Sequence, residues 1–389
     1  MQSTTPVVLT DFRPVSLAEP IDQTEYIENL AHWMIKARTA ELGGSFSAAE
    51  ADELREAVKA FGVKPEYIGA RELNAVMPGP EGFSLSTFPD IEVDPFGRDV
   101  SWRMDQNDQL LDAAFRLAFD DAEEAPSALV HVTSGGYSAP SPPQRYIAKR
   151  GWSDTAVAHI YHMGCFAAFP AVRSAVGSIY TDQALAPNAR TRADIFHSEY
   201  FSLHVNLNAR KPEDIISFTL FGDGFIRYSA VPETALPKGQ RALRVIALQD
   251  AVVPDSADEM TWRLHTRQFS LHLGKDVPNY INDNCLAFAE SLCAKAGFDF
   301  HQRKRDLAYA IHTGGPKILD YVQEQFQMAP DKMTHARELL LERGNMSSAA
   351  CPHLWERILN DDSIAPGTKI LSLGFGPGLT VAGMIMEKI

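Results

Sequence analysis

Apolar residues recur along the chain with two different spacings, and these spacings predict its secondary structure. Short apolar runs bounded by glycine, proline or polar residues predict strands. Apolar residues three and four positions apart predict amphipathic helices. Strands are predicted within 7–14, 127–136, 192–205 and 242–253, helices within 23–43, 48–62, 106–122 and 280–298, and composite units with a central turn within 159–180, 306–326, 335–360 and 368–387.

The predicted strands and helices alternate, which is typical of an α/β fold. The second half of the chain repeats the general order of elements in the first half. A polar segment that contains proline and glycine, VPETALPKGQR at 231–241, is the best candidate for the join between them. We therefore expect an N-terminal half at 1–235 and a C-terminal half at 236–389.

The composition narrows the classes of function. The 389 residues include 50 acidic and 36 basic side chains, which give a net charge of −14. Nucleic acids and anionic membrane surfaces both favour clustered Lys and Arg, so neither is expected as a partner. The sequence has no apolar run of about 18 residues, and its first residues lack a basic flank with an apolar core. No membrane span and no signal peptide are therefore expected.

The cysteines indicate the compartment. Cys165, Cys285, Cys293 and Cys351 form no CxxC pair and no His/Cys cluster with zinc spacing. Disulfide frameworks belong to small secreted domains, so a reduced cytoplasmic location is the expectation for a chain of this size.

Three predicted strand-to-turn junctions each place one reactive side chain beside small residues: Cys165, His312 and Asn345. A thiol becomes a nucleophile when an imidazole stabilises its thiolate. An imidazole and a carboxamide N–H can together hold the oxygen of a thioester as it gains negative charge. The set suits acyl transfer through a thioester. Each residue alone is also typical of a core thiol or of a turn, and spacing does not decide between these readings.

A series of motifs resembles a known family. The motifs are GCFA at 164–167, FGDG at 221–224, HTGGPKILD at 312–320, GNMSSA at 344–349 and GFGPGLT at 374–380. In this order they closely resemble the type III polyketide synthases, the chalcone and stilbene synthase family of the thiolase superfamily, in a bacterial-type member. The resemblance spans residue 7 to the C-terminus. GNMSSA followed by GFGPGLT favours this family over the ketoacyl synthase III enzymes.

The resemblance implies a thiolase-like, five-layered αβαβα duplication that forms a homodimer. It implies that Cys165 takes the acyl group, that His312 supports the thiolate, and that His312 and Asn345 bind the thioester oxygen of malonyl-CoA during decarboxylation. A Claisen condensation then extends the acyl chain. No metal and no permanently bound cofactor is implied; malonyl-CoA and an acyl-CoA are the substrates.

The resemblance also implies pocket residues. Two gatekeeper positions fall on Val205 and Leu271, where smaller side chains suit an aliphatic starter and an alkylpyrone or alkylresorcinol-type product. Phe169 follows GCFA, where plant enzymes have glycine, and Thr313 replaces the usual proline after His312. The remaining implied substrate-binding residues are Thr133, Ser138, Gly374, Phe375, Gly376, Pro377 and Gly378.

The resemblance implies three basic residues that hold the phosphates of CoA, and this set is incomplete here. Of three basic family positions, this chain retains Lys64, with alanine at 57 and 60. The donor is therefore CoA or an acyl carrier protein. Two alternative functions remain open: a ketosynthase that makes a single condensation, and, more remotely, a non-catalytic binding partner with a thiolase fold.

Overall fold

The computed structural model describes residues 5–43, 45–79, 82–185 and 191–389. These residues form one nine-stranded sheet with the order β13-β14-β15-β10-β1-β9-β8-β6-β7. Its strands are β1 (Val7–Val15), β6 (Ala128–Thr133), β7 (Ala156–Tyr161), β8 (Ala193–Glu199), β9 (Gly224–Pro232), β10 (Leu243–Val252), β13 (Ala308–Ile311), β14 (Lys369–Gly376) and β15 (Thr380–Lys388).

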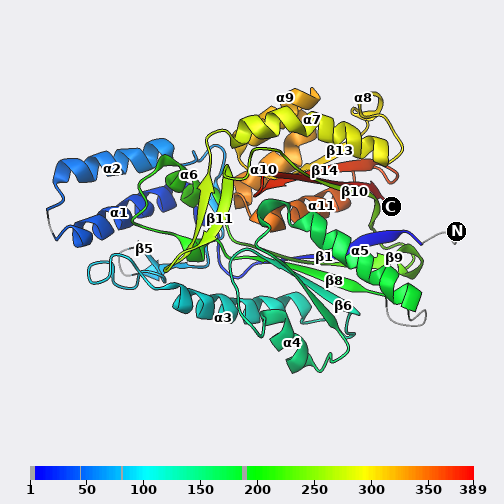
Figure 1. Ribbon diagram of the computed structural model, residues 1–389, viewed down its shortest axis with the longest axis horizontal. Helices are drawn as coiled ribbons and strands as arrows, with labels where there is room; N and C mark the ends of the chain where they lie inside the picture. Colours follow the sequence, from blue (N-terminus) through cyan, green and yellow to red (C-terminus); the bar gives the residue numbers. More distant parts are fainter. Residues whose placement is uncertain (1–4, 44, 80–81, 186–190) are drawn as a thin grey trace.

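The helices and short strand pairs surround this sheet (Figure 1). The helices are α1 (Gln23–Glu41), α2 (Ala48–Phe61), α3 (Val100–Phe119), α4 (Pro142–Arg150), α5 (Ala168–Leu185), α6 (Pro212–Leu220), α7 (Val277–Lys295), α8 (Phe300–Arg303), α9 (Pro316–Phe326), α10 (Thr334–Arg343) and α11 (Ala350–Asn360). The short pairs are β2 (Ile21–Asp22) with β3 (Ala70–Arg71), β4 (Val76–Gly79) with β5 (Gly82–Leu85), and β11 (Met260–Leu264) with β12 (Phe269–Leu273).

The sheet contains an internal repeat. Strands β1 and β10 pair antiparallel at its centre, with Val8 opposite Arg244. Outward from this pair, each half adds an antiparallel strand, β9 or β15, and then a second one, β8 or β14. Each half then adds a parallel strand, β6 or β13. The predicted α/β duplication is thereby confirmed.

The helices divide the two halves of the sheet into layers, which follow one another from bottom to top in Figure 1. Helices α3 and α4 cover the outer face of the first half, where Phe115 and Phe119 pack against Phe196 of β8. Helices α5 and α11 lie in the middle, and Phe169 meets Trp355 edge to face with ring centroids 6.0 Å apart. Helices α7 and α9 cover the second half. The arrangement matches the expected five layers.

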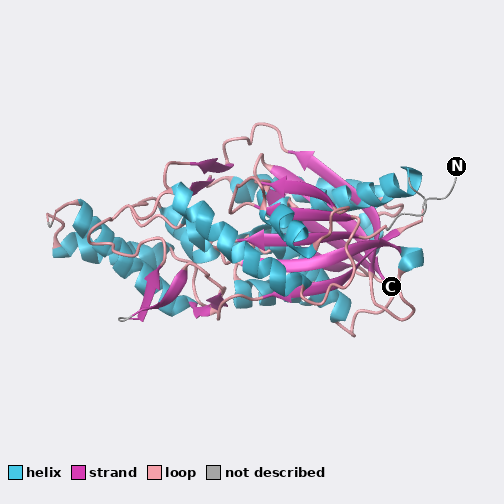
Figure 2. Ribbon diagram, turned by 90° about the horizontal axis from the view of Figure 1, so that it is seen from below, coloured by secondary structure: helices cyan, strands magenta, loops and turns pink. Residues whose placement is uncertain are grey.

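The predicted starts of α1 and α2 are confirmed, and a side chain caps each of them. Asp22 accepts a hydrogen bond from the Glu25 N–H at the start of α1. Ser47 and Glu50 form a reciprocal capping box at the start of α2. These two helices extend away from the sheet, to the left in Figures 1 and 2, and pack in their own apolar cluster.

The sequence analysis missed some elements near the site. Helix α3 begins at Val100, well before the predicted 106, because the Asp99 side chain caps it by accepting from the Trp102 N–H. The β11–β12 hairpin and strand β9 were not predicted. Residues 233–242 connect β9 to β10, close to the predicted join. The division at 235/236 stays a prediction. Among the described helices, none is long and apolar enough to cross a membrane.

Candidate active site

One cavity brings the three predicted catalytic residues together. It has a volume of about 930 Å³, and Cys165, His312 and Asn345 all line it. The Cys165 sulfur lies 4.0 Å from Oδ1 of Asn345. These residues belong to three segments that are far apart in sequence, and the convergence supports the acyl-transfer reading over the reading as separate core and turn residues.

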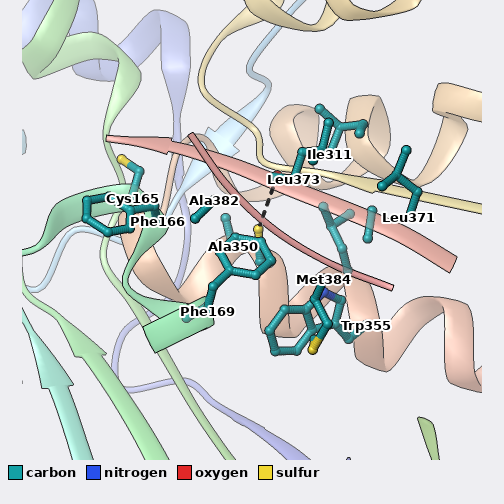
Figure 3. Packing of buried hydrophobic residues seen from close by; sticks show 14 of the residues in the cluster. Cys165, Phe166, Phe169, Ile311, Ala350, Trp355, Leu371, Leu373, Ala382 and Met384 are labelled. Carbon is teal, nitrogen blue, oxygen red and sulfur yellow. Dashed lines mark hydrogen bonds between the residues drawn. The ribbon is translucent and has the colours of Figure 1, made fainter. Parts of the chain in front are cut away.

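The turn that presents Cys165 depends on a glycine. Cys165 lies in a short 3₁₀ turn, Gly164–Phe166, between strand β7 and helix α5. Gly164 has a φ of +68°, and a Cβ placed on it would lie 2.7 Å from Cδ of Pro377. Glycine satisfies both conditions, because it tolerates the left-handed region and adds no side chain. The turn leaves Cys165 only 8% exposed, at the edge of the core (Figure 3).

The GFGPG segment supports this turn from behind. A Cβ on Gly374 would lie 2.7 Å from the Phe169 ring, and one on Gly376 would lie 2.5 Å from the Phe166 ring. These glycines let β14 approach the segment that follows Cys165. Because side chains alternate along a strand, Phe375 and Pro377 face the other way and line the cavity.

His312 directly follows strand β13. Its backbone N–H donates to the Leu373 carbonyl at 2.9 Å, and its side chain is 1% exposed. Within the described chain, neither ring nitrogen has a hydrogen-bond partner. The pKa of the imidazole is lowered to about 3 by burial. The next residue, Thr313, donates from its hydroxyl to the Gly344 carbonyl at 3.4 Å and so links this loop to the one with Asn345.

The FGDG motif positions Asn345. Phe221 and Asn345 form an isolated parallel β-bridge. The Asn345 N–H donates to the Leu220 carbonyl at 2.9 Å, and the Gly222 N–H donates to the Asn345 carbonyl at 3.0 Å. Oδ1 of Asn345 accepts from the Ser347 N–H at 2.8 Å. This bond identifies the oxygen of the carboxamide and leaves its NH₂ group to face elsewhere.

Burial keeps the Cys165 thiol protonated. The pKa of the Cys165 thiol is raised to about 12, first by burial and further by the nearby Glu199 carboxylate, while contacts with Ser347 and Asn345 oppose the rise. With His312 also neutral, the resting pair is a thiol and an imidazole. Neither ring nitrogen of His312 is hydrogen-bonded to the sulfur. A thiolate and an imidazolium that line the same cavity of low dielectric constant would stabilise each other.

The structure places the other predicted residues in two groups. Leu271, Phe375, Pro377 and Lys64 line the cavity. Thr133 is instead buried and donates to the Ser198 carbonyl at 2.7 Å, and Ser138 donates to Asp108 at 2.9 Å. The other predicted residues outside the described cavity wall are Phe169, Val205, Gly374, Gly376 and Gly378.

Val205 packs in the apolar cluster of helix α1 and is 2% exposed. The cavity wall that we expected near it is built instead by aromatic residues. Phe201 stacks on Phe221 with centroids 4.1 Å apart and on Trp262 at 5.2 Å. Trp262 Nε1 donates to the Ser134 carbonyl at 2.8 Å. The signal for Phe221 was its place in FGDG, a motif that carried the family resemblance but was not assigned to the cavity wall.

Polar groups in the described residues show no sign of a metal centre. No group of three or more His, Cys, Asp or Glu side chains in this part of the chain is arranged to hold a metal ion. The four cysteines are buried and form no disulfide.

Comparisons with known proteins relate the chain to one family. Residues 244–389 match the family model "Chalcone and stilbene synthases, C-terminal domain". Type III polyketide synthase C of Arabidopsis thaliana is 27% identical over 269 residues, which cover 67% of each chain. Type III polyketide synthase A of the same plant is 28% identical and matches over 65% of its length. The chain thus spans about two thirds of these curated relatives.

Solved structures resemble the whole chain. PKS-I of the brown alga Ectocarpus siliculosus superimposes with a TM-score of 0.80 at 20% identity, and the alignment covers 100% of each chain. The 1,3,6,8-tetrahydroxynaphthalene synthase of Streptomyces coelicolor A3(2), a bacterial type III polyketide synthase, superimposes with a TM-score of 0.73 at 20% identity over 98% of this chain and 99% of that one. These similarities identify the fold.

Proposed function

The chain belongs to the chalcone and stilbene synthase family of type III polyketide synthases, and on this premise we propose that it is an acyltransferase that loads an acyl starter on Cys165 and extends it with malonyl-CoA. The observation that supports this proposal most directly is the shared cavity of Cys165, His312 and Asn345. The cavity adds to the family resemblance the observation that the three side chains share one space.

Loading begins with the neutral pair. His312 takes the proton of the Cys165 thiol, and the thiolate attacks the carbonyl carbon of the acyl-CoA. The tetrahedral intermediate expels CoA as a thiolate, which recovers the proton from the imidazolium. The acyl group is then bound to sulfur, His312 is neutral again, and no net proton has been gained or lost.

Extension uses His312 and Asn345 again. No base has to remove a proton, because loss of CO₂ generates the enolate. The carboxylate of malonyl-CoA leaves as CO₂, and its bonding electrons form an enolate whose oxygen accepts hydrogen bonds from His312 and Asn345. The enolate carbon attacks the acyl group on Cys165 and expels the sulfur as a thiolate. The lengthened chain now sits on CoA. Transfer back to Cys165 releases that CoA and starts the next round.

The wall of the cavity supports an aliphatic starter. Its volume of about 930 Å³ is at the upper end of the range for small-molecule sites. Much of the surface away from the catalytic residues is aliphatic, and a flexible alkyl chain fits such a surface better than a rigid polar ring does. An alkylpyrone or alkylresorcinol-type product follows. The aliphatic lining residues are Val63, Ile216, Leu271, Leu273, Val277, Ile281 and Ile318.

The rim of the cavity supports CoA as the donor. Lys64, Lys275 and Lys317 line it and are exposed. Among the described residues, none of these three lysines forms an ion pair with a carboxylate; Lys64 donates to the backbone carbonyl of Lys59 at 2.5 Å. Unpaired ammonium groups suit the phosphates of CoA. A carrier protein, which is typically acidic, would meet a surface with a net charge of −14.

Two finer assignments complete the proposal. The protein acts in the cytoplasm, where its four free cysteines stay reduced. It forms a homodimer, and the aromatic side chain of Tyr137, which is 68% exposed, supports this assignment.

Incubation of the purified chain with malonyl-CoA and a panel of medium- and long-chain acyl-CoAs tests the function. We expect release of CoA and CO₂ and pyrone or resorcinol products extended by several ketide units. A product lengthened by a single unit would identify a single-condensation ketosynthase. Neither CO₂ nor CoA from a broad panel would identify a non-catalytic protein.

A further inference from the structure

A chain of buried polar side chains lies behind Cys165, and the mechanism above does not use it. Ser348 donates to Oε1 of Glu199. The same hydroxyl lies 2.9 Å from Nδ1 of His197, and Nε2 of His197 lies 3.2 Å from the hydroxyl of Tyr228. All four side chains are buried, with exposures of 2% or less. They come from strands β8 and β9 and from the turn that follows Asn345.

This chain reaches the nucleophile. The Ser347 side chain interacts with both the Cys165 thiol and the Glu199 carboxyl. The Ser134 N–H, on the cavity wall, donates to the other oxygen of Glu199 at 2.9 Å. Burial raises the pKa of Glu199 to about 7, although its hydrogen bonds with Ser348 and Ser134 lower it. Glu199 is thus a carboxyl group whose raised pKa lies near neutral pH. The Ser347 side chain links it to the sulfur of Cys165.

The hydrogens of the chain can be assigned by counting donors. Burial lowers the pKa of His197 well below its usual value and keeps its ring neutral, so one nitrogen carries a hydrogen. When Glu199 is ionised, Ser348 must donate to it. Nδ1–H then donates to Ser348, and Nε2 accepts from Tyr228. When Glu199 is protonated, it can donate to Ser348, and the whole chain can reverse to the Nε2–H tautomer.

Other titratable groups face this chain from neighbouring elements. Cys165 faces Glu199, and Cys351 of α11 interacts with Tyr228. His131 of β6 and His353 of α11 disfavour a charge on His197. Both of these histidines have their own partners, since His131 bonds to Ser198 and Tyr161 and His353 bonds to the Ala349 carbonyl. None of these groups takes the place of Ser348, whose hydroxyl donates a hydrogen bond to Glu199.

We propose that His197 is a positioning residue, which through Ser348 holds Glu199 in place behind Cys165 and changes tautomer when Glu199 gains or loses its proton. Its effect on catalysis rests on the function proposed above, because Glu199 adjoins the sulfur that would take the acyl group. The link between His197 and Glu199 is a property of the protein without substrate.

The test measures the titration midpoint of Glu199 and the tautomer of His197 in the full chain. Infrared difference spectra across a pH titration give the midpoint of Glu199, as the carboxylic acid band that disappears in Glu199→Gln. Nitrogen NMR of histidine-labelled protein gives the tautomer of His197, assigned by its loss in His197→Asn. In the wild type we expect the tautomer to change at the same pH as the Glu199 midpoint.

Substitutions separate the two ring nitrogens. The amide nitrogen of asparagine can take the place of Nδ1–H, so His197→Asn should leave the Glu199 midpoint within about 0.3 pH units of the wild type. His197→Gln places its amide near Nε2 and should raise the midpoint by about one pH unit, because Ser348 is no longer held as a donor. Tyr228→Phe should also raise the Glu199 midpoint, but by a smaller amount.

The matched control is Tyr161→Phe, since Tyr161 bonds in the same way to a different buried histidine, His131. It should leave the Glu199 midpoint unchanged. An equal midpoint in Tyr228→Phe, His197→Gln and the wild type, or a His197 tautomer that stays constant through the titration, would overturn the proposal. If the midpoint shifts as expected while the wild type does not decarboxylate malonyl-CoA, the proposed function fails and this link stands.

Discussion

Oδ1 of Asn345 lies 4.0 Å from the sulfur of Cys165, although 180 residues separate them in sequence. The same oxygen accepts the Ser347 N–H at 2.8 Å. With its oxygen held in this way, the carboxamide can offer its NH₂ group to a ligand above the sulfur. Within the described chain, that NH₂ group has no hydrogen-bond partner in the protein, as would be required of a donor reserved for a thioester oxygen.

Substitution of Asn345 should separate loading from extension. In Asn345→Ala, loss of one donor to the enolate oxygen should slow decarboxylation of malonyl-CoA about 10²- to 10³-fold. Loading of Cys165 by acyl-CoA, followed by mass spectrometry of the intact protein, should change much less. Equal losses in both steps would contradict a role in holding the enolate.

The pH dependence of Cys165 alkylation should report on His312. With a pKa of about 12 for the thiol and about 3 for the imidazole, both groups are neutral between these values. The ion pair forms by proton transfer within the pair, without uptake or release of a proton. Labelling through this ion pair does not depend on pH between about pH 6 and pH 9, whereas labelling through direct loss of the thiol proton rises about tenfold per pH unit. A nearly constant rate in the wild type is therefore the result expected if His312 takes the proton.

His312→Ala removes the internal proton acceptor. Formation of the thiolate then requires loss of a proton to solvent, so the labelling rate should be lower and should rise about tenfold per pH unit over the same range. Peptide mapping distinguishes Cys165 from the other buried cysteines. A rate that rises equally steeply in the wild type would show that His312 does not take the proton.

The tight approach of Gly164 to Pro377 can be tested with a matched glycine. Gly164 and Gly151 have nearly the same φ, +68° and +69°, but a Cβ on Gly151 would have no atom within 4 Å. Gly151→Ala should cost about 1 kcal/mol of unfolding free energy and leave activity unchanged. Gly164→Ala adds a clash with Pro377, so it should cost about 2–4 kcal/mol in denaturant titrations and abolish most activity.

Leu271 on the β11–β12 hairpin should limit the length of the starter. It lines the cavity, so Leu271→Trp should remove space and shift the ratio of kcat/KM values toward shorter acyl-CoAs by about tenfold. Leu264 on the same hairpin is 66% exposed, and Leu264→Trp should leave the ratio as it is. An unchanged preference in Leu271→Trp would place the acyl chain elsewhere in the cavity.

Lys317 should contribute to recognition of the CoA phosphates. Reversal of its charge in Lys317→Glu should raise KM for malonyl-CoA about three- to tenfold at low salt, with a smaller effect at high salt. Lys238→Glu makes the same change in charge at an exposed lysine in the segment between β9 and β10 and should have little effect. With an N-acetylcysteamine thioester, which has no phosphate, Lys317→Glu and wild type should react alike.

The sequence predicted many individual strands and helices because their signals are local, whereas the five layers were implied by the family resemblance. The strand at 7–14 and the helix at 48–62 were predicted from the spacing of their apolar residues, and the structure confirms both. Such signals depend on neighbours within a few positions. Helix α3 shows where they fail: its first turns bury the charged side chain of Arg103, which has 0% exposure, so they do not follow the amphipathic pattern.

In the candidate site, the sequence likewise identified residues that belong to local motifs and missed those that only tertiary packing brings to the cavity. The motifs identified Cys165, His312 and Asn345, and all three line the cavity. The family resemblance implied a gatekeeper position at Val205, but its side chain packs in the cluster around helix α1. The aromatic wall of Phe201, Phe221 and Trp262 joins three separate segments, and no local pattern connects them.

The sequence by itself determined many of the elements that form and singled out the three side chains to which we assign the chemistry. These depend on short-range sterics and on residue type. Only the tertiary structure decided which side chains line the cavity and which charge the buried groups hold. A direction into or out of a cavity depends on the packing of distant segments, and the pKa of Glu199 or Cys165 depends on how completely those segments exclude water.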